Sequence, residues 1–425
     1  MQTTEEIYAR YLTILKRHLV PAMGCTEPVA IAYAAAKVRD VLGQVPERIH
    51  ICVSRNILKN VKSVIVPNTD GLKGIQAAVA AGIVAGRSEK KLEVIATVQE
   101  EQKKKMRSYM ESHDITVGAA AEDILFFIDI TAYGNETKAH LVISGSHTNI
   151  VLIEKDGEIL FQKEEKEEED VPQDVPENLL TVKKIREFAD VVRTEDIEGL
   201  VGRQIDYNMK IAKMGLEKRY GANIGKVILN HGEKTSLTYA RAAAAAASDA
   251  RMGGCELPVI IISGSGNQGI SASVPIATYG EREGYSREQI LRAVALSDLL
   301  TIHLKNGIGY LSAYCGAVCA GCAAGAGLAY LCGGGDAEIA HTLVNSLAIV
   351  SGMICDGAKP SCASKIAFSV EAGIHGYQMY QDGQQFYCGD GIVPGNVELM
   401  IDNIGRLGNQ GMRQTDKEII DMMLQ

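Results

Sequence analysis

The residues between 315 and 362 decide how this chain is interpreted: CGAVCAGCAAGAGLAYLCGG (315–334) opens the stretch and SGMICDGAKPSC (351–362) closes it. Six of the ten cysteines of the chain fall inside it, namely Cys315, Cys319, Cys322, Cys332, Cys355 and Cys362. Thiols crowded together in a chain without an export signal serve metal binding or catalysis more often than disulfide formation. The stretch therefore predicts a metal-binding or catalytic centre.

The residues around Cys355 and Cys362 favour metal ligation. The apolar run from His341 to Met353 is helix-like, Asp356-Gly357 is a turn signal, and Ser361 is a candidate N-cap. Cys355 is then expected at the end of one helix and Cys362 at the start of the next, so that both thiolates can point at one metal centre. The competing interpretation is a pair of small buried side chains beside a turn.

Cys315, Cys319 and Cys322 have C-x3-C-x2-C spacing, which resembles the cluster motif of radical S-adenosylmethionine enzymes. That motif lies in a loop, whereas the residues here are typical of a helix, on which the three positions share one face. We therefore reject the radical interpretation and interpret Cys319, Cys322 and Cys332 as packed side chains.

Cys25 lies in a second informative stretch, PAMGCTEP (21–28). Pro21 and Gly24 interrupt a first helix, and Thr26 and Pro28 suit the start of the next. Cys25 is thus expected at a helix N-terminus, where partial positive charge favours a thiolate and lowers the pKa of the thiol. A packed cysteine in a turn explains the pattern equally well before any resemblance is considered.

The glycine-rich stretch SGSGNQG (263–269) predicts an anion-binding turn. Backbone N–H groups exposed by such glycines before a helix can hold a carboxylate or a phosphate, with Asn267 and Gln268 beside it. No Gly-Lys-Ser/Thr follows, so this is not a Walker loop. The alternative is a tight turn between packed helices.

The remaining pattern predicts an α+β fold. Residues 48–54 and 115–161 read as strands, with hairpin turns at Tyr133-Gly134-Asn135 and Asp156-Gly157. The acidic run KEEKEEEDVPQDVP (163–176) reads as a linker. We expect a mixed α/β domain with antiparallel strands over 1–162, which carries Cys25, the linker over 163–176, and an all-helical domain over 177–425. The site is expected between the two domains.

Three further segments carry weaker expectations. Residues 93–98 are strand-like. Ser54, Asn56, Lys59 and Asn60 could form an anion-binding loop, but a solvated surface is the favoured interpretation. His147, in a polar loop between two strands, is likewise interpreted as a surface residue rather than a substrate contact.

Composition excludes several classes of protein. The net charge of −9 and the lack of a basic cluster argue against a nucleic-acid partner. No run reads as a membrane span, and the N-terminus has no signal-peptide layout. Ten cysteines without an export signal point to reduced thiols in the cytoplasm. A small-molecule ligand is therefore expected, and a homo-oligomer is left open.

Four separated motifs together carry a resemblance to a known family. They are PAMGCTEP (21–28), SDARMGG (248–254), SGSGNQG (263–269) and SGMICDGA (351–358). On these motifs the chain resembles the bacterial and archaeal L-cysteine desulfidase family over essentially its whole length. That family is related to the α chain of iron–sulfur L-serine dehydratases.

The resemblance implies a 4Fe–4S cluster held by three cysteines, which match Cys315, Cys355 and Cys362, so that the helical domain would be the cluster-binding one. It also implies that Cys25 is a catalytic residue that acts on the proton of the substrate. Three protein ligands would leave one iron open, as in catalytic metal sites generally, to act as a Lewis acid on the β-substituent. The substrate carboxylate would lie at Asn267 and Gln268.

The expected reaction is β-elimination of L-cysteine to pyruvate, ammonia and hydrogen sulfide. The residues do not separate this reaction from the dehydration of L-serine at the same cluster, because an open iron could accept either leaving group. A third possibility of a different class is a cysteine-rich metal-binding sensor without turnover.

Overall fold

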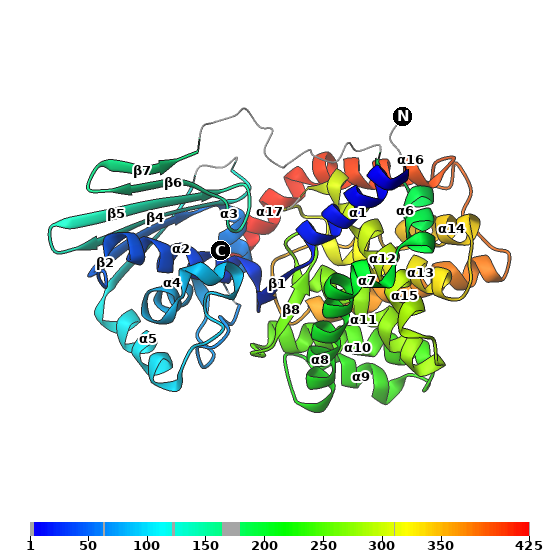
Figure 1. Ribbon diagram of the computed structural model, residues 1–425, viewed down its shortest axis with the longest axis horizontal. Helices are drawn as coiled ribbons and strands as arrows, with labels where there is room; N and C mark the ends of the chain where they lie inside the picture. Colours follow the sequence, from blue (N-terminus) through cyan, green and yellow to red (C-terminus); the bar gives the residue numbers. More distant parts are fainter. Residues whose placement is uncertain (1–3, 63, 121–123, 164–178, 310, 425) are drawn as a thin grey trace.

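The computed structural model describes residues 4–62, 64–120, 124–163, 179–309 and 311–424. Apart from Lys163, the acidic linker predicted over 163–176 lies outside these residues. The predicted domain boundaries therefore stay a prediction. In the described residues a β-sheet with its covering helices lies on one side of the molecule and a large group of helices on the other (Figure 1).

The elements before residue 163 alternate between helices and strands. In chain order they are α1 Thr4–His18, β1 Val20–Met23, α2 Thr26–Leu42, β2 Arg48–Val53, α3 Arg55–Val61, α4 Gly74–Ala85, the 3-10 helix η1 Ser88–Glu93, α5 Glu100–Ser112, β3 Asp114–Ala119, β4 Phe127–Gly134, β5 Thr137–Ser144, β6 Ile150–Lys155 and β7 Glu158–Gln162.

The elements after residue 178 are mostly helices. They are α6 Val182–Val191, α7 Thr194–Ile197, η3 Glu198–Gly202, α8 Arg203–Glu217, α9 Ile224–His231, α10 Ser236–Met252, β8 Pro258–Ile261, α11 Gly266–Glu283, α12 Arg287–Ile308, α13 Gly316–Leu331, α14 Asp336–Val350, α15 Cys362–Gln381, α16 Val397–Arg406, η4 Leu407–Gly411 and α17 Arg413–Leu424. The short segments η3 and η4 are π-helical turns.

The larger sheet has the strand order β3-β2-β4-β5-β6-β7, in which only β2 and β3 are parallel. Its residues alternate between a buried face and a half-exposed face: in β4, Ile128, Ile130 and Ala132 are fully buried, whereas Asp129 and Thr131 are half-buried. Helix α2 packs on this sheet and α4 packs on α2. One covered face explains the period of two that predicted these strands.

Most of the predicted elements are present, and the predicted α+β class is confirmed. Asn135, Asp156 and Gly157 have positive φ at the two hairpin turns, as turns of this type require. The strand predicted over 93–98 is wrong, because residues 94–97 form turns after η1.

Helices α13 and α15 are in direct backbone contact. A Cβ atom on Gly325 would lie only 2.4–2.5 Å from the backbone of Gly373, and one on Gly321 would lie 2.5 Å from Ser369. The backbones therefore touch, which only glycine permits. The two pairs have the same offset along the chain, so the helices are parallel and their N-termini lie at the same end.

Three elements connect the two sides of the molecule. Strand β1 pairs antiparallel with β8, α1 lies against α12 of the helical region, and α17 returns from the end of the chain to contact α3. The strand β8 also corrects the expectation of an all-helical second region. Within the described ranges, no helix is both long enough and apolar enough to cross a membrane.

Candidate functional site

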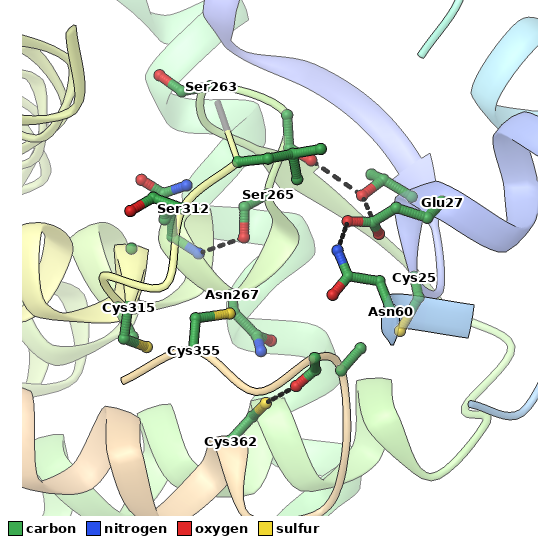
Figure 2. Close-up of a pocket in the computed structure, with 18 of the residues that line it drawn as sticks. Cys25, Glu27, Asn60, Ser263, Ser265, Asn267, Ser312, Cys315, Cys355 and Cys362 are labelled. Atoms are coloured by element: carbon green, nitrogen blue, oxygen red, sulfur yellow. Dashed lines mark hydrogen bonds between the residues drawn. The ribbon is translucent and has the colours of Figure 1, made fainter. Parts of the chain in front are cut away.

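A pocket of about 990 Å³, including its open mouth, lies between the sheet side and the helical side. Every residue predicted for the site lines it: Cys25, Asn267, Gln268, Cys315, Cys355 and Cys362. Figure 2 shows Cys25 on one side of this pocket and Cys315 and Cys355 on the other. The structure thus brings together residues from both ends of the sequence, such as Cys25 and Cys362.

Helix packing and a short backbone pairing bring three cysteines to one end of the pocket. Cys315 is the N-cap of α13 and Cys362 is the first residue of α15, so the parallel packing of these helices places the two side by side. The backbone N–H of Cys315 donates to Met353 O at 3.1 Å, and that of Cys355 donates to Ala313 O at 2.6 Å. The prediction that Cys355 ends a helix is wrong, because α14 ends at Val350 and Cys355 lies in the loop before α15.

The three thiols suit an iron–sulfur cluster by donor type. All are free of disulfides, and the carbonyl of Gly357 is 3.7 Å from the Cys362 sulfur. In the part of the chain that the structure describes, no three His, Cys, Asp or Glu side chains converge closely enough to hold a single metal ion. A cluster has a different requirement, because each iron takes its own thiolate and the sulfurs need not meet at one point. The residues present fit a cluster better than a single ion.

Lysines lie near these thiols, of which Cys315 is buried and Cys355 and Cys362 are half-buried. Burial raises the pKa of Cys315, and the neighbouring thiols Cys355 and Cys362 raise it further. Lys305 is buried near Cys315 and Cys355, and no acidic side chain of the described residues pairs with it. Lys365 also lies near them but pairs with Asp356. Positive charge around buried sulfurs favours an anionic ligand there.

Cys25 is the N-cap of α2, but residues of the helical region hold it in place. Strand β1 pairs with β8 just before it, and Arg251 Nε donates to Gly24 O at 3.0 Å. The Cys25 thiol lies 3.7 Å from Met252 Sδ and is 1% exposed. Burial raises its pKa to about 12 despite the opposing charge of Arg251. The expected lowering at a helix N-terminus is therefore wrong for this pocket, because desolvation outweighs it.

Asn267 and Gln268 occupy the first turn of α11, directly after the glycine-rich loop. Asn267 Oδ1 accepts from Arg251 at 3.1 Å, whereas Gln268 is buried against Gly316 at the start of α13. A Cβ atom on Gly266 would lie 2.4 Å from Arg251 Nε. The close approach of the Arg251 guanidinium therefore requires a glycine at this position.

Three further pocket residues were interpreted as surface residues from the sequence. That interpretation is wrong for Lys59 and Asn60, which are buried, whereas His147 is half-buried and lines the pocket. Lys59 and Asn60 are 4% and 7% exposed, because α17 covers α3 and Asp416 pairs with Lys59. The His147 ring stacks edge-on against Phe126, and its Nε2 atom is buried with no hydrogen-bond partner among the described residues. Burial lowers the pKa of His147. The one feature of the sequence that could have indicated a site role for His147 is its position in a loop between two strands.

Comparisons with known proteins give two consistent results. The family described as "Serine dehydratase alpha chain" matches residues 89–421. A UPF0597 protein of Desulfitobacterium hafniense is 56% identical over 424 residues, which cover 100% of this chain and 98% of the relative. UPF0597 proteins of Lachnoclostridium phytofermentans and Treponema denticola are 44% and 42% identical, over 98% and 100% of this chain and 100% of each relative.

These matches bear on the resemblance found in the sequence. The relation to the serine dehydratase α chain is confirmed. The matched residues 89–421 contain Asn267, Gln268 and the three clustered cysteines. Cys25 lies before residue 89 and outside that match, although the UPF0597 relatives span it. The narrower assignment to L-cysteine desulfidases stays a prediction.

Proposed function

We propose that this chain, which belongs to the serine dehydratase alpha chain family, is a lyase-type enzyme. The reaction that we propose is elimination of the β-substituent of a small amino acid. The leading substrate is L-cysteine, with pyruvate, ammonia and hydrogen sulfide as products. The observation that carries the proposal is the pocket itself, which is lined by the three thiols of Cys315, Cys355 and Cys362 and by the buried thiol of Cys25 with polar groups beside it.

Cys315, Cys355 and Cys362 would hold a 4Fe–4S cluster. When bound, a cluster with three protein ligands supplies a Lewis-acidic iron that can accept thiolate or hydroxyl from Cβ. Lys305 and Lys365 lie near these thiols and would offset negative charge there.

Cys25 would take the proton from Cα. In the substrate-free pocket it is a thiol, because burial keeps its pKa high. The guanidinium of Arg251 already lowers that pKa, and the ammonium of a bound amino acid would add a second positive charge that favours the thiolate. With the Cα proton on Cys25, the leaving group departs from Cβ, and the aminoacrylate released tautomerises and hydrolyses to pyruvate and ammonia.

Dehydration of L-serine is the second candidate, and the description of the matching family favours it. The same residues would act, with hydroxide in place of hydrosulfide as the leaving group. A metal-binding sensor without turnover is the alternative of another class.

Paired assays of the anaerobically reconstituted chain separate these proposals. We expect pyruvate from L-cysteine with equal release of sulfide, and a lower kcat/KM for L-serine. Pyruvate from L-serine alone would replace the leading substrate with the second. Bound iron with no pyruvate from either amino acid would leave the sensor and overturn the proposed enzyme.

A further inference from the structure

Glu27 is the one acidic side chain among the described residues that line the pocket, and its carboxylate is held in a fixed position. Asn60 Nδ2 donates to one oxygen, Oε1, at 2.9 Å. Thr26 Oγ1 lies 3.0 Å from the other oxygen, Oε2, and 2.9 Å from the carbonyl of Gly264. Two contacts from the sheet side, from Asn60 on α3 and from Thr26 on α2, thus hold the Glu27 carboxylate at the wall of the pocket (Figure 2).

No cationic side chain of the described residues forms an ion pair with Glu27. Arg251, which is 5% exposed, likewise forms no ion pair with an acidic side chain of the described residues. Its Nε donates to Gly24 O at 3.0 Å and one terminal nitrogen donates to Asn267 Oδ1 at 3.1 Å, so both of these partners are neutral oxygens. The pocket therefore contains one carboxylate and one guanidinium, each without a partner of opposite charge.

Both charges lie close to Cys25 and His147. Arg251 lowers the pKa of the Cys25 thiol and Glu27 raises it, and the two residues have the same opposing effects on the pKa of His147. Both side chains line the same pocket as Cys25 and His147. Charged groups withdrawn from water are costly unless a ligand or another residue pairs with them.

We propose that Glu27 binds the α-ammonium group of the substrate and Arg251 its carboxylate, so that the site selects zwitterionic α-amino acids. This inference rests on the proposed function and names the residues that fix its substrate class. Ammonium and carboxylate are both attached to Cα, so these two contacts would hold the Cα–H bond beside Cys25. The side chain of the amino acid would then extend toward the three clustered thiols. Asn267 would act through Arg251, as a positioning residue.

Calorimetric titration with unreactive probes tests the inference. L-alanine carries both charges but no leaving group, and propionate lacks only the ammonium. The full-length chain is titrated before and after anaerobic reconstitution. We expect wild type to bind L-alanine at least tenfold more tightly than propionate, because propionate leaves the Glu27 charge without a partner.

Two variants and one control make the expectation specific. Glu27→Gln removes the charge but keeps a similar shape, so L-alanine should bind at least tenfold more weakly while propionate binding is unchanged. Arg251→Met should weaken the binding of both probes. Glu101→Gln, at an exposed position on α5, should bind both probes like wild type. Thermal unfolding of each variant establishes that it is folded.

The inference is overturned if wild type binds L-alanine no better than propionate or not at all. Unchanged affinity of folded Glu27→Gln for L-alanine overturns it as well. These results are distinguishable from failure of the proposed function. Glu27-dependent binding of L-alanine in a chain that forms no pyruvate would preserve this inference and refute the enzyme, whereas turnover of cysteine with an unchanged KM in Glu27→Gln would do the reverse.

Discussion

The ion pair between Lys59 and Asp416 gives the sharpest test of how α17 holds the pocket together. Its Nζ–Oδ1 distance is 2.6 Å, and the two side chains are only 2% and 13% exposed. Lys59 lies on α3 and lines the pocket, whereas Asp416 lies on α17 at the other end of the chain. The pair therefore ties the sheet side to the C-terminal helix.

Asp416→Asn leaves the Lys59 ammonium buried without an anion. Removal of one partner from a buried pair costs about 3–5 kcal/mol, because the remaining charge stays desolvated. The double variant Lys59→Met/Asp416→Leu removes both charges and should recover most of that loss, since the two apolar side chains can pack in the same space.

Urea unfolding followed by circular dichroism measures these differences as changes in the free energy of unfolding. The pair between Arg55 and Asp421 is a matched control on the same two helices, at 3.6 Å and with side chains 30% and 53% exposed. Asp421→Asn should cost less than about 1 kcal/mol. If Asp416→Asn costs no more than Asp421→Asn, the conclusion that burial makes the Lys59 pair important is wrong.

Three further predictions follow from other parts of the structure. Cys25→Ala should lower kcat by about 100-fold or more, as loss of a proton-transfer group does, and an unchanged iron content would show that the cluster site is intact. Gly325→Ala forces α13 from α15 and should cost about 1–3 kcal/mol in urea unfolding, whereas Gly352→Ala, with open space around it, should cost little. Burial raises the pKa of Asp249 to about 6, so its stabilising contribution is complete below pH 4 and is lost as the pH rises through 6. Wild type should therefore lose about 2 kcal/mol between pH 4 and 7 relative to Asp249→Asn, and parallel pH profiles would contradict that shift.

The elements that depend on local pattern could be predicted from the sequence. The strand at 48–53 and the hairpin at Asp156-Gly157 follow from alternation and turn residues. The helix starts at Thr26 and Cys362 follow from the same kind of local signal. Spacing also placed Cys319 and Cys322 inside a helix, where both are fully buried and away from the pocket lining.

The failures at Lys59, Cys25 and His147 involve neighbours that are distant in the sequence. The sequence around Lys59 predicts a solvated side chain, but α17 covers it in the structure and Asp416 pairs with it. Cys25 lies at a helix N-terminus as predicted, but packing against Met252 removes water from the thiol and raises its pKa instead. His147 is in a polar loop, yet that loop faces the helical side of the molecule. Local pattern does not contain the burial that such long-range contacts produce.

Iron and sulfide content after anaerobic reconstitution tests the central claim most directly. We predict about four of each per chain, with a visible iron–sulfur absorption band, in wild type and in the buried control Cys322→Ser. Cys315→Ser, Cys355→Ser and Cys362→Ser should each lose most of both. Wild type that binds no iron, or a control that loses as much as these three variants, would contradict the account.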